Sequence, residues 1–153
     1  MALSEEAIRR LVYQSCMTLD VEDCAGYLAL CGTNYRYRIT TYSPELKKDM
    51  VWLDHSRKDL ANMLEMVPQH VRLPGKFLRH ATVQVVDPGE RPGEWKVVSA
   101  LSVYYTDPDG ETRLFAVGRY HDRIEDTGGT PWLAAREVRL ETRILGPGSH
   151  LPM

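Results

Sequence analysis

Two histidines in the sequence stand directly beside an aspartate, the pairing from which a general base is built. The pairs are Asp54-His55 and His121-Asp122. An acidic group that orients an imidazole prepares the ring to take up a proton. However, His121 and Asp122 fall in a run with the period of a β-strand, so their side chains should point to opposite faces. Asp54 and His55 precede an expected helix, where a loop surface or an ion pair is the simpler interpretation.

The histidines and cysteines lack the spacing of a metal site. None of the five histidines forms an HxH or HxxxH pair with another. The three cysteines, Cys16, Cys24 and Cys31, match no zinc or iron–sulfur ligand pattern. A facial triad would have to assemble from distant residues, and no motif favours it. We therefore expect no metal or cofactor in this chain and three reduced thiols that are mostly buried.

Arginine alternates with aromatic, apolar or acidic residues in three stretches. One of them, residues 35–42, has the composition of a stacking platform for single-stranded nucleic acid. The net charge of −2 argues against that partner. Alternation of this kind is typical of a solvated sheet face and equally of a polar protein–protein interface, where arginine is enriched. The candidate interface residues are Arg36, Arg38, Arg119, His121, Arg123, Arg139, Glu141 and Arg143.

The elements that must position these residues are clearest in the C-terminal half of the sequence. Turn sequences at 87–89, 107–110 and 127–130 divide it into β-branched and aromatic runs. Strands of this length imply a strongly curved sheet, and Gly118 in mid-strand is an expected place for a bend. The expected strands are 77–86, 95–105, 112–124 and 132–145. In the last strand the expected apolar face comprises Trp132, Ala134, Val138, Leu140 and Ile144.

The N-terminal half predicts helices and a strand pair. Ser4 is the expected N-cap of a first helix that ends near Asp20. A second helix is expected over 21–30, with Gly32 as its C-cap. Strands follow at 34–42 and 50–53, and then a third helix is capped by Ser56 and ended by Pro68. Helices gathered on one face of a largely antiparallel sheet make this an α+β fold.

Bulk properties set further limits. A length of 153 residues fits one domain over 1–153. No apolar run approaches the roughly 20 residues of a membrane span, so we expect no membrane association. The acidic start of the sequence lacks the basic and apolar segments of a signal peptide, which predicts a cytoplasmic location. Neither a glycine-rich phosphate loop nor a GxSxG elbow is present.

Several short stretches together resemble a known family. They are 35–40, 50–54, 78–80, 138–145 and the tail 151–153. With the order of elements, they resemble the small (β) subunit of aromatic-ring-hydroxylating dioxygenases. That subunit has the cystatin-like cone fold of ketosteroid isomerases, scytalone dehydratase and polyketide-cyclase-like proteins. The resemblance implies a curved mixed sheet, with a four-strand meander and a short strand pair, covered by three N-terminal helices.

The resemblance also implies a role and a partner. In that family the large α subunit holds a Rieske [2Fe-2S] cluster and a mononuclear iron, and the β subunit stabilises an assembly that is commonly three α and three β. The chain would then be a non-catalytic component of an NAD(P)H-dependent oxygenase and would self-associate as a trimer. The substrate of the oxygenase would be aromatic, sulfonated or a related compound.

Two alternative functions share the cone fold. The first is a free-standing isomerase, dehydratase or cyclase, with Asp54, His80, Tyr104 and Tyr120 inside the cone and Tyr37 as a further hydroxyl. Desolvation in such a pocket would raise the pKa of an aspartate until it served as a base. The second is a non-catalytic interaction module that has no oxygenase partner.

Overall fold

The computed structural model describes residues 3–66, 73–145 and 152–153. Within these ranges the elements follow the predicted order, with two helices, a strand pair, a third helix and a meander of strands. The elements are α1 (Glu5–Asp20), α2 (Cys24–Ala29), β1 (Cys31–Ser43), β2 (Lys48–Ser56), α3 (Arg57–Met66), β3 (Lys76–Pro88), β4 (Glu94–Thr106), β5 (Thr112–Thr127) and β6 (Thr130–Leu140).

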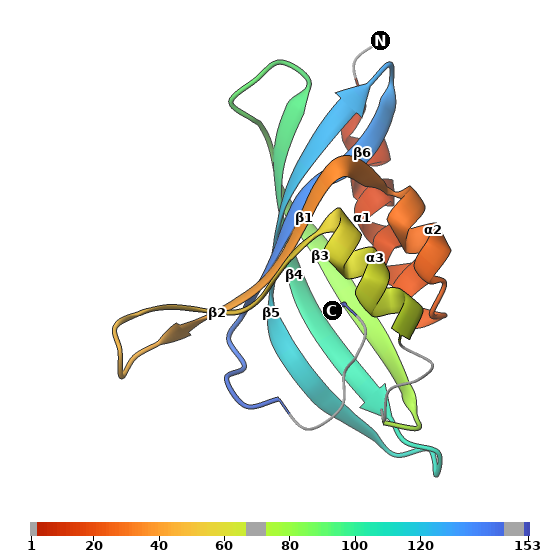
Figure 1. The fold of residues 1–153 in the computed structure, drawn as a ribbon, viewed down its shortest axis with the longest axis vertical. Helices are drawn as coiled ribbons and strands as arrows, with labels where there is room; N and C mark the ends of the chain where they lie inside the picture. The colour runs from red at the N-terminus through yellow and green to blue at the C-terminus, as the bar shows by residue number, and fades with distance from the viewer. Residues whose placement is uncertain (1–2, 67–72, 146–151) are drawn as a thin grey trace.

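These strands form one mixed sheet in the order β2-β1-β6-β5-β4-β3 (Figure 1). Neighbouring strands are antiparallel except β1 and β6, which run parallel with Arg36 opposite Ala135 and Thr41 opposite Leu140. The parallel pair attaches the N-terminal hairpin to the end of the C-terminal meander. The predicted curved α+β sheet, with a strand pair beside a four-strand meander, is confirmed.

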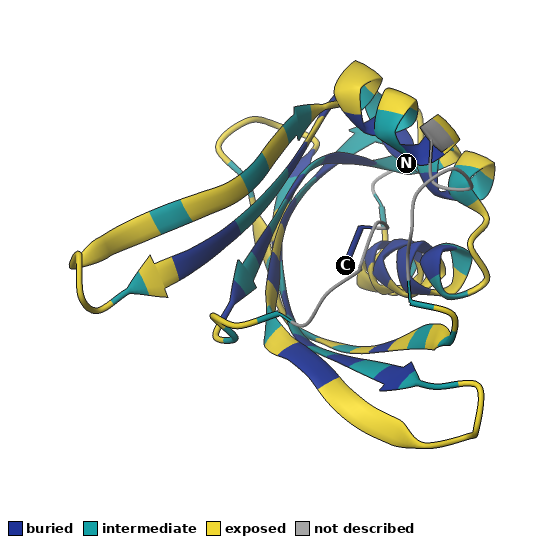
Figure 2. Ribbon diagram, turned by 60° about the horizontal axis from the view of Figure 1, so that its bottom comes forward, coloured by how far each residue is buried: buried dark blue, intermediate teal, exposed yellow. Residues whose placement is uncertain are grey.

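The helices α1, α2 and α3 lie on the concave side of the sheet (Figure 2). As predicted, α1 is capped by Ser4, whose Oγ accepts a hydrogen bond of 3.1 Å from the Ala7 amide. Ser56 caps α3 in the same way and accepts from the Asp59 amide at 3.2 Å. The buried stripe of α1 that faces the sheet comprises Ile8, Leu11, Val12, Cys16 and Leu19.

The curvature of the sheet depends on Gly118 and on irregularities in the strand pairing. A Cβ atom at Gly118 would collide with the carbonyl oxygen of Arg139 on β6, so only glycine allows the two backbones to approach this closely. The register of β5 shifts once against β4, between Val103 and Tyr104, and once against β6, between Arg123 and Ile124. Bulges of this kind bend a strand and increase its twist. Gly118 therefore marks a close approach of two backbones, with the register shifts of β5 on either side of it, and the bend expected at Gly118 itself stays a prediction.

Three predicted boundaries were wrong. The last strand ends at Leu140 rather than residue 145, because the Glu141 and Thr142 amides both turn onto the Val117 carbonyl and leave the ladder. The second helix starts at Cys24 rather than residue 21, because Glu22 adopts a positive φ of 57° and turns the chain. Gly32 lies inside β1 and does not cap that helix. The predicted helix end at Pro68 lies outside the described residues.

The core lies between the helices and the concave face of the sheet. It combines the apolar stripe of α1 with inward-facing residues of the strands, among them Tyr37, Leu101, Tyr120 and Val138. Among the described residues, no helix is both long enough and apolar enough to cross a membrane.

Candidate functional site

One face of the sheet turns away from the helices, and we call it the outer face. Along β1, Tyr35 and Tyr37 are buried beneath the helices, so the alternate residues Arg36 and Arg38 lie on the outer face. The same alternation places Arg119, His121 and Arg123 of β5 and Arg139 of β6 there. The predicted interface residues on this face are Arg36, Arg38, Arg119, His121, Arg123 and Arg139. Glu141 and Arg143 follow the end of β6 and are exposed.

Most arginines on this face bind carboxylates of the same chain. Arg36 Nε lies 2.7 Å from Asp54 Oδ1, and Arg139 Nη2 lies 2.7 Å from Asp49 Oδ1. The Arg36–Asp54 contact joins the two strands of the β1–β2 hairpin, whereas the Arg139–Asp49 contact ties that hairpin to β6. The Arg36 hydrogen bond lowers the pKa of Asp54, and the Arg139 hydrogen bond lowers that of Asp49. Both acids are solvent-accessible, so water and salt screen the pairs.

A shallow groove of about 460 Å³ crosses the outer face. Val98 and Ala135 provide its apolar lining, and the cationic side chains of Arg36, Arg38 and Lys96 border it with His121. Apolar surface framed by arginine is the composition found at protein–protein interfaces. The groove gives the outer face a shape that a partner could fill.

The four residues expected in an internal catalytic pocket do not meet. Tyr120 alone lies inside the cone, where it is buried. Asp54 lies on β2 bound to Arg36, so its predicted position between helices and sheet was wrong. His80 and Tyr104 touch each other, with ring centroids 5.1 Å apart, but on the outer face. Their placement follows from strand alternation, because the neighbouring Arg79 points inward.

The cone interior holds phenols that stay neutral. The hydroxyls of Tyr27 and Tyr35 are 2.5 Å apart, and both rings are buried. Burial raises the pKa of Tyr37 to about 12 and that of Tyr120 well above its usual value. Burial likewise raises the pKa of Cys31 to about 12. Groups that hold their protons so tightly make poor bases and nucleophiles near neutral pH.

An ion pair that the sequence analysis missed lies in the same interior. Arg136 on β6 donates two hydrogen bonds to Asp122 on β5, at 2.8 and 3.0 Å, and neither side chain is exposed. Burial by itself would lower the pKa of Arg136, but the Asp122 carboxylate together with Tyr27 and Tyr120 raises it well above its usual value and keeps the guanidinium charged. The guanidinium stacks on the Tyr120 ring at 3.8 Å from its centroid. The sequence does indicate a buried charge here, because Arg136 interrupts the apolar alternation between Ala134 and Val138.

The described parts of the chain contain no group of three or more His, Cys, Asp or Glu side chains that could hold a metal ion. The described residues therefore do not fit an iron centre. The arrangement instead offers a charged outer face with a groove and a densely hydrogen-bonded interior.

Comparisons with known proteins give a consistent result. Residues 14–146 match the model of a family described as "Ring hydroxylating beta subunit". The chain is 36% identical, over 97% of its length and 86% of the relative, to the methanesulfonate monooxygenase hydroxylase subunit beta of Methylosulfonomonas methylovora. It is 31% identical to the 2-aminobenzenesulfonate 2,3-dioxygenase subunit beta of an Alcaligenes species, over 96% and 97% of the two chains.

Solved structures agree on the fold. A chain of naphthalene 1,2-dioxygenase superposes with a TM-score of 0.78 at 18% identity, over 99% of this chain and 86% of the other. A Nostoc punctiforme protein of unknown function with a cystatin-like fold superposes with a TM-score of 0.62 at 16% identity, over 94% and 98%. At these identities the likeness concerns the fold alone.

Proposed function

The chain belongs to the family of ring hydroxylating beta subunits, and from this premise we propose that it is the structural subunit of an oxygenase that acts on a sulfonated compound. Beta subunits of this family pair with a large alpha subunit, which holds the iron, and carry no cofactor themselves. The observation that carries the proposal is the match to the family over residues 14–146, with relatives aligned over nearly the whole chain.

The substrate class rests on the two curated relatives. One is named for methanesulfonate and the other for 2-aminobenzenesulfonate, so the shared group is the sulfonate rather than the ring. The substrate would bind in the large subunit, beside the iron. This chain would influence turnover only by holding that subunit in its assembled form.

For the assembly we propose three copies of this chain and three of the large subunit, located in the cytoplasm. The three free cysteines favour a reducing compartment. Two surfaces support the partner contacts. The first is the outer face, with its arginines and groove. The second is the β1–β2 hairpin, which projects beyond the rest of the sheet (Figure 1). The hairpin exposes the large apolar side chains of Tyr42, Leu46, Val51 and Trp52.

Oxygen uptake by the purified complex, supplied with NADH and its electron-transfer partners, tests the substrate class. We expect methanesulfonate or 2-aminobenzenesulfonate to stimulate uptake. The carboxylate analogues acetate and 2-aminobenzoate are matched controls, because they keep the carbon skeleton and the negative charge. Uptake with 2-aminobenzoate but with neither sulfonate would overturn the sulfonate proposal and leave the subunit role intact.

A further inference from the structure

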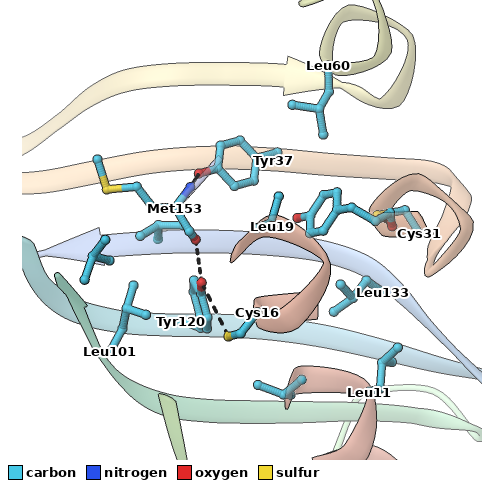
Figure 3. Close-up of a cluster of buried hydrophobic side chains, with 14 of the residues drawn as sticks. Leu11, Cys16, Leu19, Cys31, Tyr37, Leu60, Leu101, Tyr120, Leu133 and Met153 are labelled. Atoms are coloured by element: carbon cyan, nitrogen blue, oxygen red, sulfur yellow. Dashed lines mark hydrogen bonds between the residues drawn. The ribbon is translucent and has the colours of Figure 1, made fainter. Parts of the chain in front are cut away.

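Pro152 and Met153 lie inside the cone, although the strands and helix around them come from distant parts of the sequence. Both residues are buried, and Met153 is only 3% exposed. Figure 3 shows Met153 between Tyr37 of β1 and Tyr120 of β5. Its side chain belongs to the buried cluster that also contains Leu19, Leu60 and Leu101.

Three backbone atoms of this dipeptide form hydrogen bonds with side chains. Arg79 Nη2 donates to the Pro152 carbonyl oxygen at 2.6 Å. The Met153 amide donates to the Tyr37 hydroxyl at 2.8 Å, and the Tyr120 hydroxyl donates to the Met153 carbonyl oxygen. Proline has no amide hydrogen, so Pro152 contributes only its carbonyl oxygen. Three buried side chains from three strands thus bind one short peptide.

These side chains are held by contacts that do not involve the dipeptide. Arg79 Nη1 and the Arg79 amide both bind the Asp20 carboxylate, at 2.9 and 3.0 Å. The Tyr120 ring is fixed under the guanidinium of Arg136, which Asp122 holds in turn. The two donors, Arg79 and Tyr120, would therefore keep their positions without the dipeptide. Site groups that are already in place before the ligand arrives favour binding.

Additional polar atoms beside these groups have no hydrogen-bond partner. Among the described residues they include Arg79 Nε and Arg136 Nη1, both on side chains that are almost completely buried. A buried donor without a partner is costly and is uncommon in native structures. The interior therefore has more capacity to bind a polar ligand than the dipeptide uses.

We propose that the cone interior is a binding site for an N-acylated apolar amino acid, and that Pro152–Met153 is a ligand that the chain itself supplies. Such a ligand offers an acyl oxygen to Arg79, an amide hydrogen to Tyr37 and a second carbonyl oxygen to Tyr120. Its unbranched apolar side chain takes the place of Met153. Because the dipeptide is tethered, its effective concentration is high, on the order of millimolar. A free ligand therefore binds measurably only when the dipeptide is removed.

Equilibrium dialysis with labelled N-acetyl-prolyl-methionine tests this proposal on the chain purified together with its large subunit. A variant that lacks residues 152 and 153 should bind one dipeptide per chain, and the full chain should bind none. The reversed compound, N-acetyl-methionyl-proline, lacks the amide hydrogen that Tyr37 accepts and should not bind. In the shortened variant, Tyr37→Phe should weaken binding by about tenfold, the effect of losing one hydrogen bond.

A second variant covers the case in which the shortened chain does not fold. Met153→Ala in the full chain keeps the backbone contacts and vacates only side-chain volume. This variant should bind dimethyl sulfide, which matches the atoms removed beyond Cβ, because an apolar cavity of this kind accepts a small apolar molecule. The proposal is overturned if the folded shortened variant binds neither dipeptide, or binds both equally. If the shortened variant does not fold, failure of Met153→Ala to bind the sulfide overturns it.

Discussion

The two faces of the sheet hold charge in opposite ways. On the outer face, Arg36 and Arg139 bind carboxylates that water and salt can reach. Inside the cone, Arg136 and Asp122 bind each other with no exposed surface. An exposed pair can be exchanged for a partner's groups at little cost, whereas a buried pair cannot be opened without leaving an uncompensated charge. The outer face is therefore suited to contact with another subunit, and the interior to holding this one together.

The largest expected effect comes from opening the buried pair. Asp122→Asn leaves the Arg136 guanidinium buried without a countercharge, and it should lower the free energy of unfolding by about 3–5 kcal/mol. Urea denaturation of the variant and the native chain measures the difference. Asp54→Asn is the matched control on the outer face, and its effect should be several-fold smaller.

A double replacement sharpens this result. Asp122→Leu combined with Arg136→Met removes both charges, and it should recover most of the stability that Asp122→Asn loses. If Asp122→Asn and Asp54→Asn cost the same, the contrast between the two faces is wrong.

The next effect concerns the hairpin as a contact with the large subunit. Trp52 is a large aromatic side chain that remains 38% exposed in the isolated chain. Trp52→Ala should weaken binding of the large subunit by about 2 kcal/mol, or roughly 30-fold, because aromatic residues dominate interface energies. Titration calorimetry with the separated subunits measures this. Val21→Ala, at a residue that is 76% exposed in the turn after α1, should change binding little. If both variants lose the same binding affinity, the hairpin is not part of the interface with the large subunit.

A smaller effect distinguishes the two faces by their response to salt. Arg139→Gln breaks the exposed contact with Asp49. The resulting loss of stability should be measurable at low ionic strength and should vanish near 1 M salt. The cost of Asp122→Asn should hardly change over the same range, because salt does not reach the buried pair. Thermal unfolding at two salt concentrations makes the comparison. A salt-independent cost of Arg139→Gln would contradict the assignment of this pair to the screened face.

The smallest effect is an acid dependence of stability. The Arg36 hydrogen bond lowers the pKa of Asp54 from its ordinary value of 3.8 in the folded chain. An acid whose folded pKa is lowered stabilises the protein above its unfolded pKa, and this contribution is lost as the pH falls through the folded pKa. Asp54→Asn should therefore reduce the slope of stability against pH below about pH 4. An unchanged slope would show that the pair contributes nothing to folding.

The alternation of side chains along each strand determined how much of the fold and of the candidate site could be predicted from the sequence. It separated His121 from Asp122 and grouped Arg119, His121 and Arg123 on one side of their strand, because period two is a local property. The same alternation puts Arg136 between Ala134 and Val138 on the apolar face, but the expected face omitted this residue. Gly118 was also recognisable from the sequence, because a glycine in the middle of a strand indicates an irregularity or a close backbone approach.

Other features depend on contacts that no local pattern records. The register shifts after Val103 and Arg123 change which residues face inward, and only the pairing of whole strands determines them. The binding of Met153 by Tyr37 and Tyr120 joins residues more than thirty positions apart. The prediction of a pocket with Asp54, His80 and Tyr104 was wrong because it considered only the residue types. It did not consider which face of the sheet each side chain occupies.

Native mass spectrometry of the chain recovered from its own host, with iron analysis of the same sample, tests whether this chain is the iron-free subunit of an oxygenase. We expect a complex with a larger, iron-containing chain in equal numbers, three copies of each. Dissociation of that complex should release this chain without iron. Recovery of the chain without a larger partner, or with about one iron per copy of this chain after dissociation, would contradict that role.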